Sequence, residues 1–252
     1  MSAYESLALL YDDFTRDVPY AEFADFYERV FSQYGRSPRI ILDLACGTGT
    51  MSCILAERGY EMIGADASPE MLAVAAEKAG MLPECVMRPL YLCQSMEEID
   101  LFGTVDAVIC TLDGLNYIPH EALPGVFQRI SLFIEPDGIF IFDINMPDAL
   151  RSLDGEVFLD ETDDAYCVWR TEWDEASQSC GYGLDVFKRE GSMWSRSFEE
   201  HTEYSHEPKE LLSQLEAFGF KDVKTFSEAD AEVHGAGKGR LFLSARKGRK
   251  DE

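Results

Sequence analysis

Two acidic residues and a glycine-rich turn follow one another in a spacing that suits an adenosine-containing cofactor. Asp43 belongs to a short apolar run, the turn Gly47-Thr48-Gly49 comes directly after it, and Asp66 closes the next apolar run. Glycine tolerates positive φ and carries no Cβ, so a ligand can approach the backbone, and the free N–H groups at a helix start attract an anion. In a Rossmann-type sheet, an acidic residue after the second strand binds the ribose hydroxyls. The simpler alternatives are a tight turn that binds nothing and a solvated Asp66 at a helix start.

Apolar and amphipathic segments alternate on either side of these residues. A helix is predicted over 20–34, and the apolar run 39–44 is typical of a strand buried on both faces. Ser68 and Pro69 predict the start of a helix that ends at Gly80. Further strands are predicted at 61–65, 84–93, 107–110, 138–142, 221–226 and 240–245, and further helices at 48–58, 123–130 and 207–218. The alternation predicts an α/β fold: a Rossmann-like, seven-stranded, mostly parallel sheet with helices on both faces.

The pattern changes to a strand-like alternation between residues 151 and 206. Apolar and polar residues alternate at 166–173, 180–188 and 193–204, which predicts two or three antiparallel strands. We therefore predict an N-terminal helical cap at 1–35, a Rossmann-like domain at 36–150 and 207–247, and an antiparallel β insertion at 151–206 that forms a lid.

The charge balance narrows the class of partner. The 47 Asp and Glu residues outnumber the 22 Lys and Arg residues, which gives a formal net charge of −25. Such a surface repels a phosphate backbone, so nucleic acid is not an expected partner. A short basic tail from Lys238 to Lys250 is interpreted as a solvated chain end.

Cysteine and histidine usage predicts no metal. The seven cysteines contain no CxxC pair, which favours neither a disulfide framework nor a zinc site. His201 and His206 fit no standard zinc spacing and are predicted to face solvent. The first residues do not resemble a secretory leader, and no stretch approaches the roughly 18 apolar residues of a membrane span, so we expect no membrane association and a cytoplasmic protein.

Taken in order, the motifs resemble those of a known family. The pattern Asp-x-x-x-Gly-x-Gly after a buried strand resembles motif I of the class I S-adenosylmethionine-dependent methyltransferases, and 64–72 resembles their next motif. The resemblance continues at 94–96, 106–110 and 136–143 and covers roughly residues 38–145. The segments 11–14 and 113–117 are similar to a bacterial small-molecule branch of this family, most members of which have no assigned acceptor.

The resemblance implies S-adenosylmethionine (SAM) as the cofactor and S-adenosylhomocysteine as the product. Backbone at Ala45, Gly47 and Gly49 then approaches the methionine part, Asp43 hydrogen-bonds around its amino group, and Asp66 binds the ribose. The implied cofactor-binding residues are Tyr11, Asp43, Ala45, Cys46, Gly47, Gly49, Asp66, Ala67, Met71, Gln94, Ser95, Met96, Cys110, Thr111 and Leu112.

Ser95 departs from the family pattern. The family often has an Asp there that accepts a hydrogen bond from the adenine amino group, and a serine accepts it without charge assistance. We therefore expect looser adenine recognition, with the Met96 N–H supplying part of it. NAD is the rival cofactor, because Ser52 occupies the position of the third small residue of the dinucleotide fingerprint. Asp43 and the order of the later motifs favour SAM.

Catalysis of methyl transfer rests mainly on alignment of the acceptor atom with the methyl group. Such alignment can lower the activation barrier by about 7–11 kcal/mol in ideal cases. A protein base is needed only where the acceptor must lose a proton. Asp113 and Tyr11 are the candidate catalytic residues. The alternatives are a helix N-cap for Asp113 and plain apolar packing for Tyr11.

Asn116, Trp169 and Trp194 are the candidate substrate contacts, because Asn116 follows the fourth strand and both tryptophans lie in the insertion. The alternative is a sheet that packs one aromatic face on the main domain. The prediction is methyl transfer from SAM to a small-molecule acceptor by in-line attack. The alternatives are a protein or RNA methyltransferase, and a SAM-binding module without catalysis. The oligomeric state does not follow from the sequence.

Overall fold

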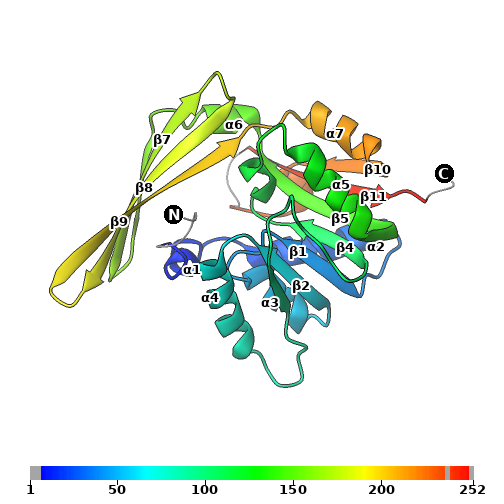
Figure 1. The fold of residues 1–252 in the computed structure, drawn as a ribbon, viewed down its shortest axis with the longest axis horizontal. Helices are drawn as coiled ribbons and strands as arrows, with labels where there is room; N and C mark the ends of the chain where they lie inside the picture. Colours follow the sequence, from blue (N-terminus) through cyan, green and yellow to red (C-terminus); the bar gives the residue numbers. More distant parts are fainter. Residues whose placement is uncertain (1–6, 236–238, 250–252) are drawn as a thin grey trace.

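A seven-stranded sheet forms the centre of the molecule in the computed structural model, which describes residues 7–235 and 239–249 (Figure 1). The strand order is β10-β11-β5-β4-β1-β2-β3. β11 runs antiparallel to both of its neighbours, and the other strand pairs are parallel. The strands are β1 (Ile40–Leu44), β2 (Glu61–Asp66), β3 (Leu90–Cys93), β4 (Val105–Cys110), β5 (Ile134–Asn145), β10 (Phe220–Phe226) and β11 (Arg240–Lys247).

Helices cover both faces of this sheet and bury a separate apolar core on each. The core on one face includes Phe127 from α5 and Leu211 from α7, and the core on the other includes Phe23 from α2 and Leu55 from α3. The longer helices are α2 (Tyr20–Gln33), α3 (Thr50–Glu57), α4 (Pro69–Gly80), α5 (Leu123–Phe133) and α7 (Pro208–Ala217), and the short ones are α1 (Tyr11–Phe14), η1 (Gly114–Tyr117), α6 (Pro147–Arg151) and α8 (Glu228–Ala231). The predicted Rossmann-like fold class is confirmed.

Local sequence signals fix several element ends. Ser68 caps α4 by accepting a hydrogen bond from Met71 N–H at 3.2 Å, with Pro69 in the first turn, as predicted. The strand predicted at 84–93 is shorter than expected and covers only Leu90–Cys93.

A second, four-stranded antiparallel sheet projects from the main body (Figure 1). Its strands are β6 (Val157–Glu161), β7 (Ala165–Asp174), β8 (Ser179–Glu190) and β9 (Met193–Tyr204). The sequence analysis missed β6, because its three consecutive apolar residues, Val157, Phe158 and Leu159, are all exposed and show no alternation. We call these four strands the insertion sheet. The division of the chain into a helical cap, a Rossmann-like domain and a lid remains a prediction.

The N-terminal segment packs against the insertion sheet as well as the main body. Leu7 and Leu10 are buried against Ala165, Leu184 and Val186 of that sheet. The Leu7 N–H also donates to the carboxylate of Glu199 on β9 at 3.0 Å. Among the described residues, no helix is long and apolar enough to cross a membrane.

Candidate cofactor-binding site

A cavity of about 410 Å³ lies at the carboxyl ends of β1, β2 and β4. In open α/β sheets ligands bind at this edge, where the connections leave the central strands in opposite directions. The cavity is lined by Tyr11, Tyr20, Asp43, Ala45, Cys46, Gly47, Thr48, Thr50, Met51, Ala65, Asp66, Ala67, Ser68, Met71, Gln94, Ser95, Met96, Glu97, Thr111, Leu112, Gly114, Tyr117 and Ile118.

The glycine-rich turn brings bare backbone to the cavity wall. Gly47 and Gly49 both have positive φ, 52° and 72°. A Cβ on Gly49 would lie 2.9 Å from the Cβ of Ala75 and would also collide with the Tyr91 hydroxyl, so only glycine fits. Ala45 also has positive φ, 57°, an uncommon conformation for a residue with a Cβ. The chain therefore holds an unfavourable conformation at the point where it forms the cavity.

Asp66 joins this turn to the start of α4. Its two carboxylate oxygens accept hydrogen bonds from the N–H groups of Gly47 at 2.9 Å and Ser68 at 2.8 Å. Burial raises the pKa of Asp66, and these backbone hydrogen bonds oppose the shift. A carboxylate has about four acceptor sites, so two bonds to backbone leave acceptor capacity for a diol. The side chain therefore both shapes the turn and offers the acceptor that a ribose needs.

Asp43 lies beneath the turn and is almost fully buried, with 1% exposure. Its carboxylate accepts a hydrogen bond from the Ser52 hydroxyl at 2.6 Å, and burial raises its pKa to about 7. A cationic amino group beside it would offset that desolvation and favour the charged carboxylate. Ser52, which also fits the dinucleotide fingerprint, therefore serves Asp43 here.

The N-terminal segment closes one side of the cavity through contacts that lie far apart in the sequence. Tyr11 and Tyr20 contribute to the lining. The carboxylate of Asp12 accepts a hydrogen bond from the Thr48 hydroxyl at 2.6 Å and lies 2.7 Å from the Lys78 ammonium. Sequence reasoning missed Asp12 and Tyr20 in this role, because no local pattern indicates which residue meets a turn so distant in the chain.

Comparisons with known proteins agree with this geometry. A family model described as a methyltransferase domain matches residues 41–138. The Bacillus subtilis (strain 168) protein YqeM, which is named as a methyltransferase, is 30% identical over 247 residues, 97% of each chain. This chain belongs to the SAM-dependent methyltransferases.

Solved structures agree with that assignment. A SAM-dependent methyltransferase from Clostridium acetobutylicum superposes with a TM-score of 0.83 at 25% identity, over 98% of this chain and 99% of that one. The sugar N-methyltransferase KedS8 from Streptoalloteichus has the same fold, with a TM-score of 0.78 at 20% identity over 98% and 94% of the two chains. SAM is the cofactor of this methyltransferase, and the cavity offers two acidic side chains, Asp66 and Asp43, whose chemistry suits a ribose diol and an amino group.

The structure places most of the implied cofactor residues on this cavity, with two exceptions. Gly49, at the start of α3, is not among the residues that line the cavity. Cys110 does not line it: the side chain is fully buried in the core, where burial raises the pKa of its thiol. The next two residues, Thr111 and Leu112, are the ones that line the cavity. Gln94 lines it too, while its side-chain carbonyl accepts the N–H of Asp100 at 3.0 Å.

Two residues after β4 have different surroundings from those predicted. Asn116 is fully buried and links three elements: it accepts from Asn145 N–H at 2.9 Å and donates to the carbonyls of Asn145 and Tyr204. Its interpretation as a substrate contact is therefore corrected to a structural role. Asp113 does not line the cavity. It occupies the N-cap position of η1, as the alternative predicted, but its side chain makes no capping hydrogen bond and its carboxylate lies 2.7 Å from the Arg240 guanidinium.

Trp169 and Trp194 of the insertion sheet do not line the cofactor cavity. Trp169 donates its indole N–H to Asp160 at 2.7 Å within the insertion sheet. Trp194 is 51% exposed and lines a separate, open groove with Tyr166 and Phe187. The role of both tryptophans as acceptor contacts stays a prediction.

The two histidines of β9 and its end are buried, contrary to the prediction. His201 is 5% exposed and lies 3.3 Å from the Glu199 carboxylate, and His206 is 2% exposed with its ring 3.1 Å from the Leu115 carbonyl. Burial lowers the pKa of His206 to about 4. Within residues 7–235 and 239–249 no group of three His, Cys, Asp or Glu side chains has metal-binding geometry.

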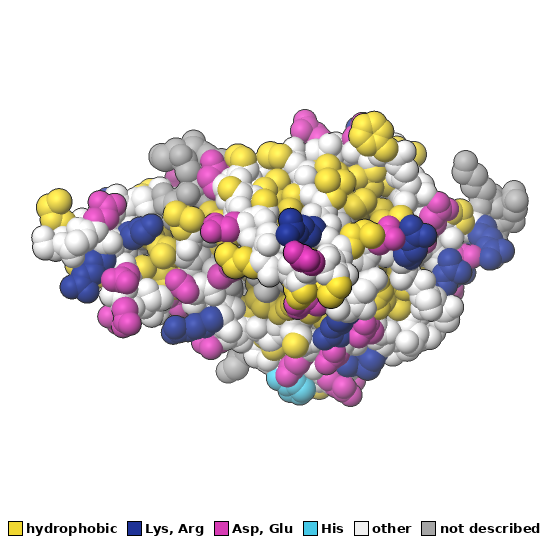
Figure 2. Space-filling view, turned by 90° about the horizontal axis from the view of Figure 1, so that it is seen from below, with side chains coloured by type: hydrophobic (Ala, Val, Ile, Leu, Met, Phe, Trp, Pro, Cys, Tyr) yellow, Lys and Arg dark blue, Asp and Glu magenta, His cyan; other side chains and the backbone are white. Residues whose placement is uncertain are grey.

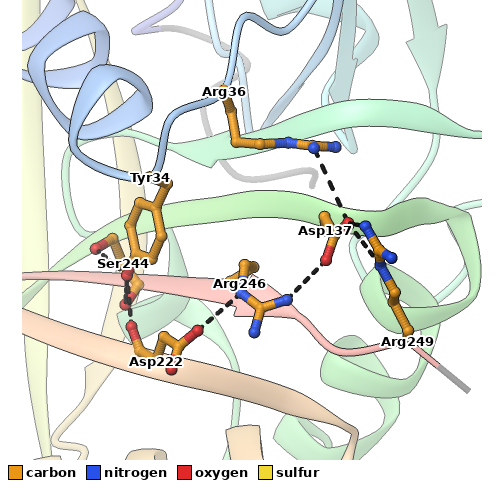
Figure 3. Close-up of polar contacts among 7 residues, drawn as sticks. All are labelled: Tyr34, Arg36, Asp137, Asp222, Ser244, Arg246 and Arg249. Carbon is orange, nitrogen blue, oxygen red and sulfur yellow. Dashed lines mark hydrogen bonds and ion pairs between the residues drawn. The ribbon is translucent and has the colours of Figure 1, made fainter. Parts of the chain in front are cut away.

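The basic tail is part of the fold where the structure describes it. Figure 3 shows Arg246 and Arg249 directed at the carboxylate of Asp137, with Arg36 approaching from the other side. Asp222 also pairs with Arg246 at 2.8 Å. These arginines are engaged with acidic side chains rather than gathered on a free basic surface, while Lys238 and Lys250 lie outside the described residues.

Proposed function

We propose that this methyltransferase transfers the methyl group of SAM to a small-molecule acceptor. One observation carries the proposal: Asp66, Asp43 and the glycine-rich turn line the same cavity as Leu112 and Tyr117. One part of this wall suits a nucleoside, and the part around Tyr117 lies next to β9, because the Tyr117 ring stands edge-on to His201 at 6.4 Å. The acceptor is proposed to enter between these residues and the insertion sheet, which then acts as a lid.

Electrostatics supports a small acceptor rather than RNA. The net charge is −25, and on the face in Figure 2 the Lys and Arg side chains lie singly among Asp and Glu side chains. A phosphate backbone gains little from such a surface. The chain also shares its fold, over most of its length, with an enzyme that methylates a sugar.

The chain's own part in the reaction is proposed to be binding, orientation and exclusion of water. Bound SAM supplies an electrophilic methyl group on a sulfonium. Tyr11 and Tyr20 line the cavity from the N-terminal segment, so we propose that they cover the bound cofactor and restrict the direction of acceptor attack. Tyr11 remains the proposed catalytic contact. Asp113 is proposed to act only indirectly, by shaping the turn after β4.

Isothermal titration of SAM into the purified protein tests the proposal first. We expect micromolar binding, and we expect Asp66→Ala to weaken it by about a hundredfold, because two or more hydrogen bonds to a charged group are lost. Asp137→Asn, at the opposite end of the sheet, is the matched control and should bind like the wild type. Absence of SAM binding in the folded wild type would sink the proposal.

A second measurement separates an enzyme from a SAM-binding module. The protein is incubated with SAM and fractionated pools of amines, hydroxy compounds and thiols, and S-adenosylhomocysteine is quantified. Turnover that disappears in Asp66→Ala supports methyl transfer to a small molecule. Binding without turnover on any pool, combined with turnover on a protein or RNA fraction, would contradict the small-molecule proposal.

A further inference from the structure

Two consecutive residues other than glycine adopt left-handed backbone conformations directly after β4. Leu112 has φ 58° and Asp113 has φ 53°. Residues with a Cβ rarely adopt this conformation, and they persist in it only where the surroundings fix them. The turn belongs to the cavity wall, because Leu112 and the following Gly114 both line the cavity.

The carboxylate of Asp143 holds this turn. One of its oxygens accepts the Leu112 N–H at 3.0 Å, and the other accepts the Asp113 N–H at 2.9 Å. Successive N–H groups in such a turn form a concavity that binds an anion, and here the anion is a fully buried side chain of β5.

Arg240 locks the carboxylate in place. Its guanidinium bonds Asp143 and also lies 2.7 Å from the carboxylate of Asp113, so it ties both sides of the turn together. The Arg240 side chain is 7% exposed, and Arg240 opens β11 in register with Asn145. Asp143 and Arg240 are buried and Asp113 is partly buried, so removal of Arg240 or Asp143 leaves a buried charge without compensation. The turn is therefore fixed by charges that cannot easily move apart.

We propose that Asp143 and Arg240 are positioning residues for the methyl-bearing end of SAM. The inference deepens the proposed function and rests on SAM occupying this cavity. The family resemblance implies that the nucleoside lies beside Asp66 and Met71 and that the sulfonium lies beside Leu112, and all three residues line the cavity. The Asp143–Arg240 pair acts through Leu112, by keeping the backbone in the left-handed conformation that sets the position of this wall.

Comparison of two ligands tests this role without a known acceptor. SAM carries the sulfonium and the amino acid, whereas 5′-methylthioadenosine keeps the adenosine part and lacks both. In Asp143→Asn one oxygen is replaced by an NH₂ group, which cannot accept the second N–H. We expect SAM to bind about tenfold more weakly to this variant, because the turn at Leu112 is no longer held in the position that the sulfonium end needs, with 5′-methylthioadenosine almost unaffected.

Asp137→Asn is the matched control. Asp137 lies on the same strand and pairs with arginines of the same C-terminal segment, but it does not line the cavity. It should leave the ratio of the two affinities unchanged. If Asp143→Asn does not fold, Arg240→Lys decides: a lysine ammonium cannot bridge the two carboxylates as the guanidinium does, so the same preferential loss of SAM binding is expected.

A double-mutant cycle separates positioning from general destabilisation. Glycine adopts positive φ without help, so in a Leu112→Gly background the Asp143→Asn change should weaken SAM binding by much less than tenfold. Equal weakening of both ligands in folded Asp143→Asn, or the same SAM loss with and without Leu112→Gly, would overturn the positioning role. Failure of the wild type to bind SAM would overturn the proposed function instead.

Discussion

The two ends of β5 carry the same residue types and use them differently. At the cavity end Asp143 is fully buried with Arg240, whose side chain is 7% exposed. At the other end Asp137 meets Arg246 and Arg249, whose side chains are 20% and 64% exposed. Burial raises the pKa of Asp143 in spite of Arg240, whereas hydrogen bonds from Arg249 and then Arg246 lower the pKa of Asp137.

The comparison shows that an Asp–Arg pair is not one kind of interaction. Where the arginine reaches solvent, as Arg249 does beside Asp137, water screens the pair and its net contribution is small. A buried pair is costly to desolvate and costly to break, so its place in a fold is better explained by what it positions than by the stability that it adds. Here the buried pair holds a left-handed turn on the cofactor cavity, and the exposed one holds the last strand.

The largest expected difference between the two ends is in stability. Arg240→Met should lower the free energy of unfolding by about 3–5 kcal/mol, because it leaves the buried carboxylate of Asp143 and the partly buried one of Asp113 without a counter-charge. Arg246→Met, the control at the exposed end, should cost several times less, since Asp137 keeps Arg249. Urea unfolding of both variants measures the difference. Equal losses would show that burial does not separate the two clusters.

The stability contributions of acidic residues at the cavity end and at the opposite end of the main sheet should also change with pH in opposite directions. Asp43, at the cavity end, has its pKa raised to about 7, so its protonated form adds stability that is complete below the ordinary Asp pKa and disappears as the pH rises through about 7. Asp43→Asn does not titrate, so its stability relative to the wild type should rise by up to about 4 kcal/mol between pH 4 and pH 8.

Asp137→Asn gives the opposite trend and serves as the control. The lowered pKa of Asp137 means that its contribution is present above the ordinary Asp pKa and is lost as the pH falls. This variant should therefore lose stability at neutral pH and match the wild type in acid. Thermal unfolding from pH 3 to pH 8 records both profiles, and two profiles of the same sign would refute the contrast.

The smallest expected effect lies at the exposed end. The Tyr34 hydroxyl donates to the Asp222 carbonyl at 2.6 Å, beside the Asp137 cluster (Figure 3). Tyr34→Phe should cost about 0.5–1.5 kcal/mol of unfolding free energy, the usual net value of one hydrogen bond, with SAM affinity unchanged. Calorimetry of unfolding and of SAM binding on the same sample checks both. A weakened SAM affinity would mean that this end of the sheet also shapes the cavity.

Local patterns predicted the parts of this protein that are set by local physics. The glycine turn and the Ser68 cap are such cases, because backbone conformation and capping depend on adjacent residues. The assignment of Cys110 to the cavity was wrong by one residue. Cys110 is the last residue of a buried strand, and the chain reaches the cavity at the next residue, Thr111.

Contacts between distant segments were not predictable in the same way. The pairing of Arg240 with Asp143 depends on β11 being inserted beside β5, which no spacing in the sequence reveals. The burial of His201 depends on which face of β9 packs inward, and an alternating strand has two candidate faces. The pattern of a single sequence shows the alternation of a strand, but it does not show which segment packs on each face of that strand.

A crystal structure with S-adenosylhomocysteine tests the central claim most directly. We predict the ribose hydroxyls on the Asp66 carboxylate, the adenine beside Met71 and Ser95, and the sulfur end toward Leu112. Ligand density at another place on the molecule, or with the adenosine turned toward Leu112, would contradict the site as it is described.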